Sequence, residues 1–231
     1  GDFHINDGAV SVASDDSLGS AADSDLVLDG GTLTASESFD IPMTRMITMN
    51  AGHGTLNVEN GKTLGVRSSI GGPGTLIKNG MGVLDLYAAN THGQTNVVQG
   101  QLNVLHADAL GAGNLNLDGG TVGFDLAGTP DFANDINITN NSGVETTRDT
   151  ILSGVINNPG STLTKTGDGL LRITGDNSAP FMGTFENNAG WTNVAGALGG
   201  TLVNNANLNG IGTVNNLINQ GQFEPGNSIG K

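Results

Sequence analysis

Short segments of alternating apolar and polar residues recur along the whole chain. Typical segments follow a glycine or an asparagine and place two apolar residues two positions apart, as in Leu56 and Val58 or Leu102 and Val104. Alternation with a period of two buries one face of a strand. No stretch sustains a period of 3.6, so we expect helix content near zero. The pattern predicts an all-β protein made of very short strands, about 3–5 residues each.

The strand segments are organised in a long internal repeat. Matching segments recur at an offset of about 92 residues near the amino end, and turn residues coincide as well as apolar ones. The pairs of segments are 8–19 with 100–111, 26–34 with 115–123, and 75–90 with 162–177. We therefore predict two related long units, about 8–99 and 100–198, followed by short coils over 199–231.

A parallel β-solenoid explains these features better than a β-sandwich does. A sandwich would have longer strands, more aromatic residues and no long repeat. In a solenoid, similar residues of successive coils stack in ladders about 4.8 Å apart. Roughly 20 residues per coil would give about eleven or twelve coils. The Asn-Gly pairs at 60–61, 79–80 and 209–210 keep some antiparallel hairpin pairing open as an alternative.

The segment 72–104 carries a more specific pattern. It reads G-x-L-x-K-x-G-x-G-x-L-x-L-x-x-x-N, followed by G-x-T-x-V-x-x-G-x-L-x-V. The residues that match are Leu76, Lys78, Gly80, Gly82, Leu84, Leu86, Asn90, Gly93, Thr95, Val97, Gly100, Leu102 and Val104. This pattern resembles the passenger-associated transport repeat of bacterial autotransporters.

A second copy of the pattern follows, and the carboxyl end adds a further resemblance. The second copy matches at Leu163, Lys165, Gly167, Gly169, Leu171, Ile173, Asn177 and Gly183. It departs from the pattern after Asn177, where Ala179-Pro180-Phe181 interrupts the expected return strand. The segment 208–230, which ends in Pro-Gly-Asn-Ser-Ile-Gly, is similar to a segment found late in such passengers.

The resemblance implies a right-handed parallel β-helix that forms one solenoid fragment of a longer passenger. It also implies export to the surface of a Gram-negative bacterium, with display at the outer membrane or release from the cell. The partners it implies are host-surface or matrix molecules, like passengers on neighbouring cells, and the protein's own outer-membrane barrel beyond this chain. Such passengers act as adhesins or self-association factors, or carry enzymes.

Composition narrows the functional classes. The formal net charge is -14 and only 8 residues are basic, which argues against nucleic acid and anionic membranes as partners. Cysteine is absent, so a disulfide framework and a cysteine metal site are both excluded. No run of about 18 apolar residues predicts a membrane helix. The first and last residues predict a fragment excised from a longer protein.

Residues that could carry hydrolytic or metal chemistry do not form a recognisable site. Ser178 follows Asp176-Asn177, but no Gly-x-Ser-x-Gly elbow surrounds it, so we interpret this stretch as a turn. The four histidines lack the spacing of metal ligands, and we expect surface, turn or packing positions for them. These histidines are His4, His53, His92 and His106.

Two groups of aspartates have two possible interpretations, a calcium-binding site or ordinary solvated turns. The first contains Asp15, Asp16, Asp23, Asp25 and Asp29, and the second contains Asp118, Asp125, Asp131 and Asp135. Neither matches a calcium-binding repeat, so solvated turns are our expectation. We predict no catalytic residues, no metal and no cofactor.

Large aromatic residues are rare, with one Trp and one Tyr in the chain. Phe181, Phe185 and Trp191 lie close together, and we interpret them as a packing patch, with a contact hot spot as the alternative. Two functional hypotheses result. The first is a surface adhesin or self-association stalk. The second is a β-helical polysaccharide-active enzyme, which would need two carboxylates in a cleft.

Overall fold

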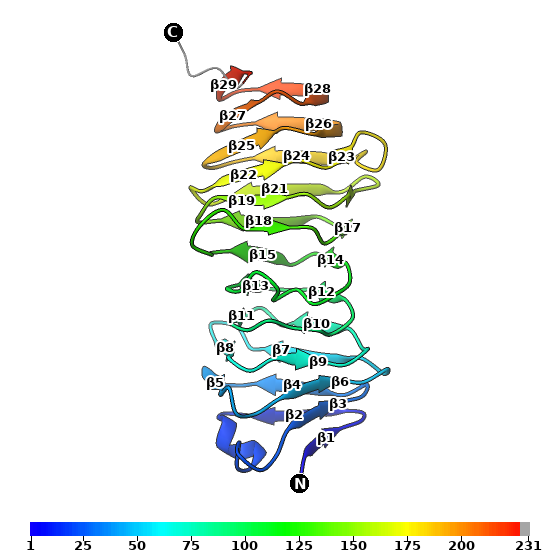
Figure 1. Cartoon of the computed structure of the whole chain (residues 1–231), viewed down its shortest axis with the longest axis vertical. Coiled ribbons are helices and arrows are strands. Elements are labelled where there is room, and N and C mark those ends of the chain that lie inside the picture. Colours follow the sequence, from blue (N-terminus) through cyan, green and yellow to red (C-terminus); the bar gives the residue numbers. More distant parts are fainter. Residues whose placement is uncertain (227–231) are drawn as a thin grey trace. The chain divides into compact units, whose positions relative to one another are not determined.

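The computed structural model describes residues 1–226, and these form an all-β protein with one short 3-10 turn (Figure 1). The chain divides into two compact units, one made of Gly1–Asn116 and Gly120–Val122, the other of Leu117–Gly119 and the residues from Gly123 on. Strands of successive coils pair in parallel and in register in both units. The predicted parallel β-solenoid is therefore confirmed.

The first unit winds three parallel sheets around an apolar interior. Their strand orders are β1-β3-β6-β9, β2-β4-β7-β10-β12 and β5-β8-β11-β13. The strands are β1 (Phe3–Ile5), β2 (Ala9–Val12), β3 (Leu26–Leu28), β4 (Thr32–Ala35), β5 (Phe39–Ile41), β6 (Ile47–Met49), β7 (Gly54–Val58), β8 (Thr63–Val66), β9 (Ile70–Gly71), β10 (Leu76–Asn79), β11 (Val83–Leu86), β12 (Thr95–Val97) and β13 (Gln101–Val104); the 3-10 turn η1 covers Asp15–Leu18.

The second unit has the same construction, with the orders β17-β20, β18-β21-β24-β26 and β16-β19-β22-β25-β27-β29; β23 and β28 also pair with β26. The strands are β16 (Asp131–Phe132), β17 (Ile136–Asn140), β18 (Ser142–Thr146), β19 (Thr150–Leu152), β20 (Ile156–Asn157), β21 (Thr162–Thr166), β22 (Leu170–Ile173), β23 (Asp176–Asn177), β24 (Thr184–Asn187), β25 (Trp191–Val194), β26 (Ala197–Asn204), β27 (Asn207–Gly210), β28 (Thr213–Asn219) and β29 (Gln222–Pro225). Two strands, β14 (Leu115–Asp118) and β15 (Thr121–Phe124), contain residues of both units.

The interior consists of aliphatic ladders. In the first unit Leu64, Leu84 and Leu102 are register partners in successive strands, and all three are fully buried. Burying one such side chain contributes roughly 1.5–3 kcal/mol relative to its exposed state. Many similar layers thus supply the stability that one large aromatic core would supply in a compact domain.

Coil length changes along each unit. In the first unit Phe39 is the register partner of Leu64, whereas further along the same sheet Leu84 is the partner of Leu102, across a shorter stretch of chain. In the second unit, the coil between β26 and β28 is likewise shorter than the coil between β21 and β24. The coil length expected from the sequence is thus an average. The turns absorb most of the difference, and the pairing of β26 with β28 adds a register shift between Leu198 and Thr201.

The Asn-Gly pairs do not make hairpins between neighbouring strands of one sheet. Gly61 and Gly80 have φ angles of 73° and 75°, and each closes a corner between strands of different sheets. One isolated antiparallel bridge joins Gly210 to Gly226. The division into long units of 8–99 and 100–198 stays a prediction, and the end of the family-like segment, 227–230, lies outside the described residues.

Candidate functional surfaces

Two lysines lie inside the solenoid rather than on its surface. Lys78 on β10 is fully buried, and its Nζ donates hydrogen bonds to the carbonyl oxygens of Asn79 (3.0 Å), Gly80 (2.7 Å) and Gln99 (3.0 Å). The first two acceptors belong to its own coil and the third to the next coil. Three acceptors match the three N–H groups of an ammonium ion. Lys78 therefore ties the corner of one coil to the corner of the next.

Lys165 on β21 repeats this arrangement in the second unit. It is fully buried, and its Nζ donates to the carbonyl oxygens of Thr166 (3.2 Å), Gly167 (2.8 Å) and Ala189 (2.8 Å). Burial lowers the pKa of Lys78 and that of Lys165 to about 8. Both lysines occupy the matching position of the repeat. Their role is internal, so they do not contribute to a binding surface.

The outer face of the first unit carries a mixed polar and aromatic cluster, which we call the Arg67–Tyr87 cluster. Arg67 Nε donates to Asp40 Oδ2 at 2.9 Å, and its guanidinium lies 4.4 Å from the centre of the Tyr87 ring. Tyr87 Oη donates to Asp85 at 3.4 Å, and Asn103 donates to the other Asp85 oxygen at 2.8 Å. Asp40, Asp85 and Asn103 come from three strands of one sheet, so the cluster covers several coils.

Electrostatics and packing hold this cluster in place. The hydrogen bond to Asp40 raises the pKa of Arg67, while burial, with Asp85 as a further cause, raises the pKa of Tyr87. Gly65 lies between Asp40 and Asp85 in register, and a Cβ there would overlap the Asp40 carboxylate. Because Gly65 has no side chain, the side chains of Asp40 and Tyr87 can both lie over the strand. The side chains remain accessible, since Tyr87 is 37% exposed.

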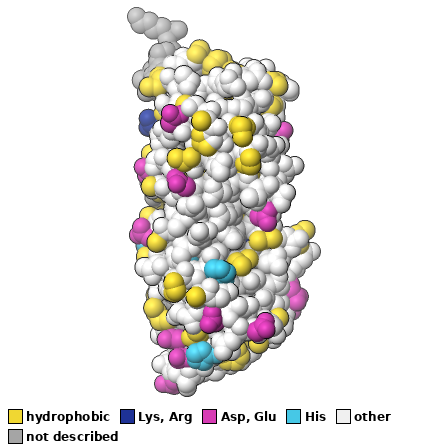
Figure 2. Space-filling view, turned by 90° about the vertical axis from the view of Figure 1, so that its right-hand side faces the viewer, with side chains coloured by type: hydrophobic (Ala, Val, Ile, Leu, Met, Phe, Trp, Pro, Cys, Tyr) yellow, Lys and Arg dark blue, Asp and Glu magenta, His cyan; other side chains and the backbone are white. Residues whose placement is uncertain are grey.

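Asparagine ladders run through the second unit. Three successive register partners, the fully buried Asn187 and Asn204 and the exposed Asn219, are joined by side-chain amide hydrogen bonds of 2.8 and 2.7 Å. On the outside, Asn193 donates to Asn209 at 2.6 Å, and Asn205 donates to Asn188 at 2.7 Å. The expected ladders of similar residues in successive coils thus include asparagines. Much of the surface in Figure 2 is accordingly uncharged, with scattered acidic groups and few basic ones.

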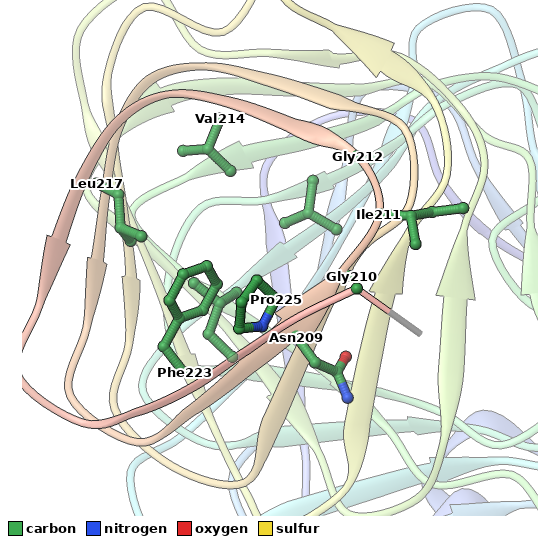
Figure 3. Close-up of a pocket in the computed structure, with 11 residues that line it drawn as sticks. Asn209, Gly210, Ile211, Gly212, Val214, Leu217, Phe223 and Pro225 are labelled. Atoms are coloured by element: carbon green, nitrogen blue, oxygen red, sulfur yellow. The ribbon is translucent and has the colours of Figure 1, made fainter. Parts of the chain in front are cut away.

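A cavity of about 530 Å³ opens at the last described coils of the second unit. Figure 3 shows Leu217, Phe223 and Pro225 facing a common space, while Ile211 points away from it. The cavity is lined by Val194, Leu208, Asn209, Gly210, Ile211, Gly212, Val214, Leu217, Phe223, Pro225 and Gly226. No residue of this lining is ionisable. The cavity can accommodate apolar groups but offers no acid or base for catalysis.

The structure places Ser178 in a local acidic turn. Its Oγ donates to Asp176 Oδ1 at 2.6 Å, and the hydrogen bonds from Ser178 lower the pKa of Asp176. The pair Asp176-Asn177 forms the two-residue strand β23 rather than the turn that we expected; the turn follows at Ser178. The difference arises because the Asn177 side chain is buried and accepts a hydrogen bond from Ile156 N at 2.6 Å.

The histidines lie apart from one another. His92 is buried as expected near a turn, where its Nε2 lies 2.8 Å from Thr95 Oγ1, and burial lowers its pKa to about 4. His53 occupies a turn with φ 71°, and its Nδ1 accepts a hydrogen bond from Thr75 N. His4 lies on the exposed side of β1, and His106 is 3.9 Å from Asp108.

Most contacts of the acidic groups are with neighbouring coils. Asp25 accepts a hydrogen bond from Met46 N, Asp29 from Gly52 N, and Asp135 from Val155 N. The expectation of a solvated turn is wrong for Asp15, because its carboxylate pairs with the buried Arg45 at 2.7 Å. Within residues 1–226, no three His, Asp or Glu side chains converge as metal ligands would.

The aromatic residues after the second repeat copy do not form one surface patch. Phe181 and Phe185 are fully buried in the interior. Trp191 is half-buried on the outer side of β25, between its register partners Leu170 and Asn207. Phe185 belongs to β24, which provides the return strand that the sequence left uncertain after Pro180. The packing interpretation therefore holds for both phenylalanines.

Parallel coils, internal ladders and corners tied by buried lysines define the class of the protein as a parallel β-solenoid. Over 122 residues, the chain is 34% identical to the Adhesin BmaC autotransporter of Brucella suis biovar 1 (strain 1330). The match covers 52% of this chain and 3% of that relative, so the chain corresponds to a small part of the relative's length.

No protein-family model matches the chain, and no solved structure is significantly similar to it. In the described part, no helix has the length and apolar character needed to cross a membrane. The similarity and the parallel β-solenoid together fit an autotransporter passenger domain. The resemblance recognised in the sequence is thereby confirmed at the level of this class.

Proposed function

We propose that this chain is a section of an autotransporter passenger that acts in adhesion at the surface of a Gram-negative bacterium. The observation that carries the proposal is the similarity to an autotransporter adhesin in a chain that folds as a parallel β-solenoid. The passenger would be displayed at the outer membrane or released. Its partners would be host-surface or matrix molecules, or like passengers on neighbouring cells.

The Arg67–Tyr87 cluster is the surface that we propose for binding. Tyrosine and arginine are enriched among residues that dominate the energy of protein contacts. Here the two side chains are stacked and hydrogen-bonded, so ordering them on binding costs little additional conformational entropy. The carboxylates and amides of Asp40, Asp85 and Asn103 surround them and can pair with polar groups of a partner.

A non-enzymatic role is part of the proposal. A polysaccharide-active enzyme would need two carboxylates facing each other across a cleft. The cavity at the last described coils is lined without carboxylates, and Asp85 of the Arg67–Tyr87 cluster is already engaged by Tyr87 and Asn103. These contacts favour adhesion over glycan cleavage.

The test is display of residues 1–231 on the surface of a non-adherent bacterium. Attachment to host cells and matrix proteins is measured alongside sedimentation of the culture. We expect the displayed chain to raise attachment or sedimentation, and Y87A and R67A to reduce the gain by at least about tenfold, as hot-spot substitutions do.

The matched control is R148A. Arg148 is also an exposed arginine and pairs with Asp125 at 2.8 Å, but within the described chain no aromatic ring stacks on it. R148A should leave attachment unchanged. An equal loss of attachment in R67A and R148A would show that the cluster is not the binding surface. If the displayed chain raised neither attachment nor sedimentation, adhesion itself would be contradicted.

A further inference from the structure

One coil of the first unit lacks a strand. The coil begins with β1 and β2, but the segment that follows leaves the solenoid path and forms η1 before the chain returns at β3. The sheet β5-β8-β11-β13 consequently starts at β5. In Figure 1 the turn η1, drawn in blue, lies beside β2 and β5, and both strands contact it. We call residues 14–24 the β5 cap.

A single buried arginine fastens this cap. Arg45, from the turn between β5 and β6, is fully buried. Its Nε and one terminal nitrogen donate to the two carboxylate oxygens of Asp15, at 2.7 and 3.1 Å. Its terminal nitrogens also donate to the carbonyl oxygens of Ser24 (2.8 Å), Gly19 (2.6 Å) and Leu18 (3.3 Å) and to Ser24 Oγ (2.9 Å).

The cap also closes the apolar interior. Leu18 at the end of η1 is 2% exposed, although η1 is polar at its other positions. The side-chain bonds of Ser24 to Leu18 O and Ser20 O stay within the cap, so Arg45 supplies most of the hydrogen bonds that join it to the coil beyond. A bidentate guanidinium–carboxylate pair is strong and directional, and breaking one when it is buried leaves an uncompensated charge.

We propose that the β5 cap is an edge-blocking strap, held shut by the Arg45–Asp15 pair, which prevents a second copy of the chain from adding a strand to β5. An uncovered strand edge presents unpaired N–H and C=O groups and is a template for another chain. Covering the edge with an irregular segment is one of the ways in which β proteins avoid such pairing. Release of the strap would expose the β5 edge together with the apolar layer beneath Leu18.

The test compares D15N with D16N in the full chain. The two aspartates are adjacent and each substitution removes one negative charge, but Asp16 is exposed and Asp15 pairs with Arg45. Hydrogen exchange is followed in residues 14–24 and in β5, and association by sedimentation velocity over a range of concentrations. For D15N we expect exchange in both segments to rise about tenfold or more, with dimers or larger species appearing as concentration increases.

The pattern of exchange decides the proposal. In D15N the strands β8, β11 and β13 should exchange as in the unchanged chain, and D16N should match the unchanged chain throughout. S24A removes one contact to Arg45 and the two side-chain bonds of Ser24 within the cap, but it retains the ion pair. It should therefore give a smaller rise in the same two segments, even if D15N does not fold. Equal effects of D15N and D16N, a uniform rise over all strands, or a D15N chain that stays monomeric at every concentration would overturn the proposal.

Discussion

The Lys78 and Lys165 corners share their contacts but differ in what stacks on them. In each, a buried ammonium binds three backbone carbonyls from two successive coils. The register partner of Lys78 in the next coil is Val97, whereas the partner of Lys165 is Asn187. An aliphatic residue therefore stacks on the first lysine. The asparagine that stacks on the second lysine begins the ladder that continues through Asn204 and Asn219.

This difference shows that the lysine corner is a self-contained unit. Its acceptors are backbone carbonyls, so the neighbouring side chain is free to vary. The corner needs the glycine that follows it, because Gly80 and Gly167 have φ angles of 75° and 77°, and an added Cβ would overlap a carbonyl of the preceding coil. The repeated Lys-x-Gly spacing is thus explained by backbone chemistry.

The largest effect is expected from removing the ammonium groups. K78M and K165M keep an apolar chain of similar length but leave three backbone carbonyls without their donor. We expect each substitution to lower the free energy of unfolding by about 3 kcal/mol. Urea denaturation followed by circular dichroism measures this loss. If only one of the two substitutions lowered the free energy of unfolding, the two corners would not be equivalent.

A smaller effect is expected from exchanging the stacked residues. V97N would bury an amide among aliphatic side chains, at a cost of about 2 kcal/mol. N187V would remove the hydrogen bonds to Asn204 and Asn207 but also the Asn187 Oδ1, which has no partner among the described residues, so we expect a cost of about 1 kcal/mol. Denaturation midpoints of the two variants measure the order. If N187V costs more than V97N, the asparagine ladder is the stronger arrangement.

A further test of the two corners is a pH dependence that they share. The pKa of each lysine is about 8 in the folded chain, below the ordinary value of 10.5, so between pH 8 and 10.5 the unfolded state binds more protons. The free energy of unfolding of the unchanged chain, relative to the K78M/K165M double variant, should therefore rise with pH across this window. Below pH 8 the difference should be constant. A fall above pH 8 would mean that the carbonyls hold the ammonium form more strongly than burial opposes it.

Much of the fold could be predicted from residue patterns. Alternation identified short strands, and the repeat identified stacked coils, because both follow from local spacing. The inward position of Lys78 was also readable, since a residue two positions after the buried Leu76 lies on the same face. Our sequence reasoning used Lys78 only as a motif residue and missed this signal.

Other features depend on contacts that no periodicity records. Asp15 and Arg45 are far apart in the sequence, and one of them lies in a segment without alternation, so their pairing follows from the three-dimensional path alone. The Arg67–Tyr87 cluster likewise unites several coils. Only the register between strands fixes which side chains meet, and the coils of that sheet differ in length, so an average coil length could not predict the cluster.

The uneven coil lengths have a consequence for how such a gene can change. Deleting one codon within a strand would turn every later side chain of that strand from the interior to the outside, and natural selection would remove it. Adding several codons at a turn would only lengthen one loop, at a small entropic cost. Insertions and deletions should therefore accumulate at corners between strands, and relatives of this chain should differ in coil length while their ladders stay aligned.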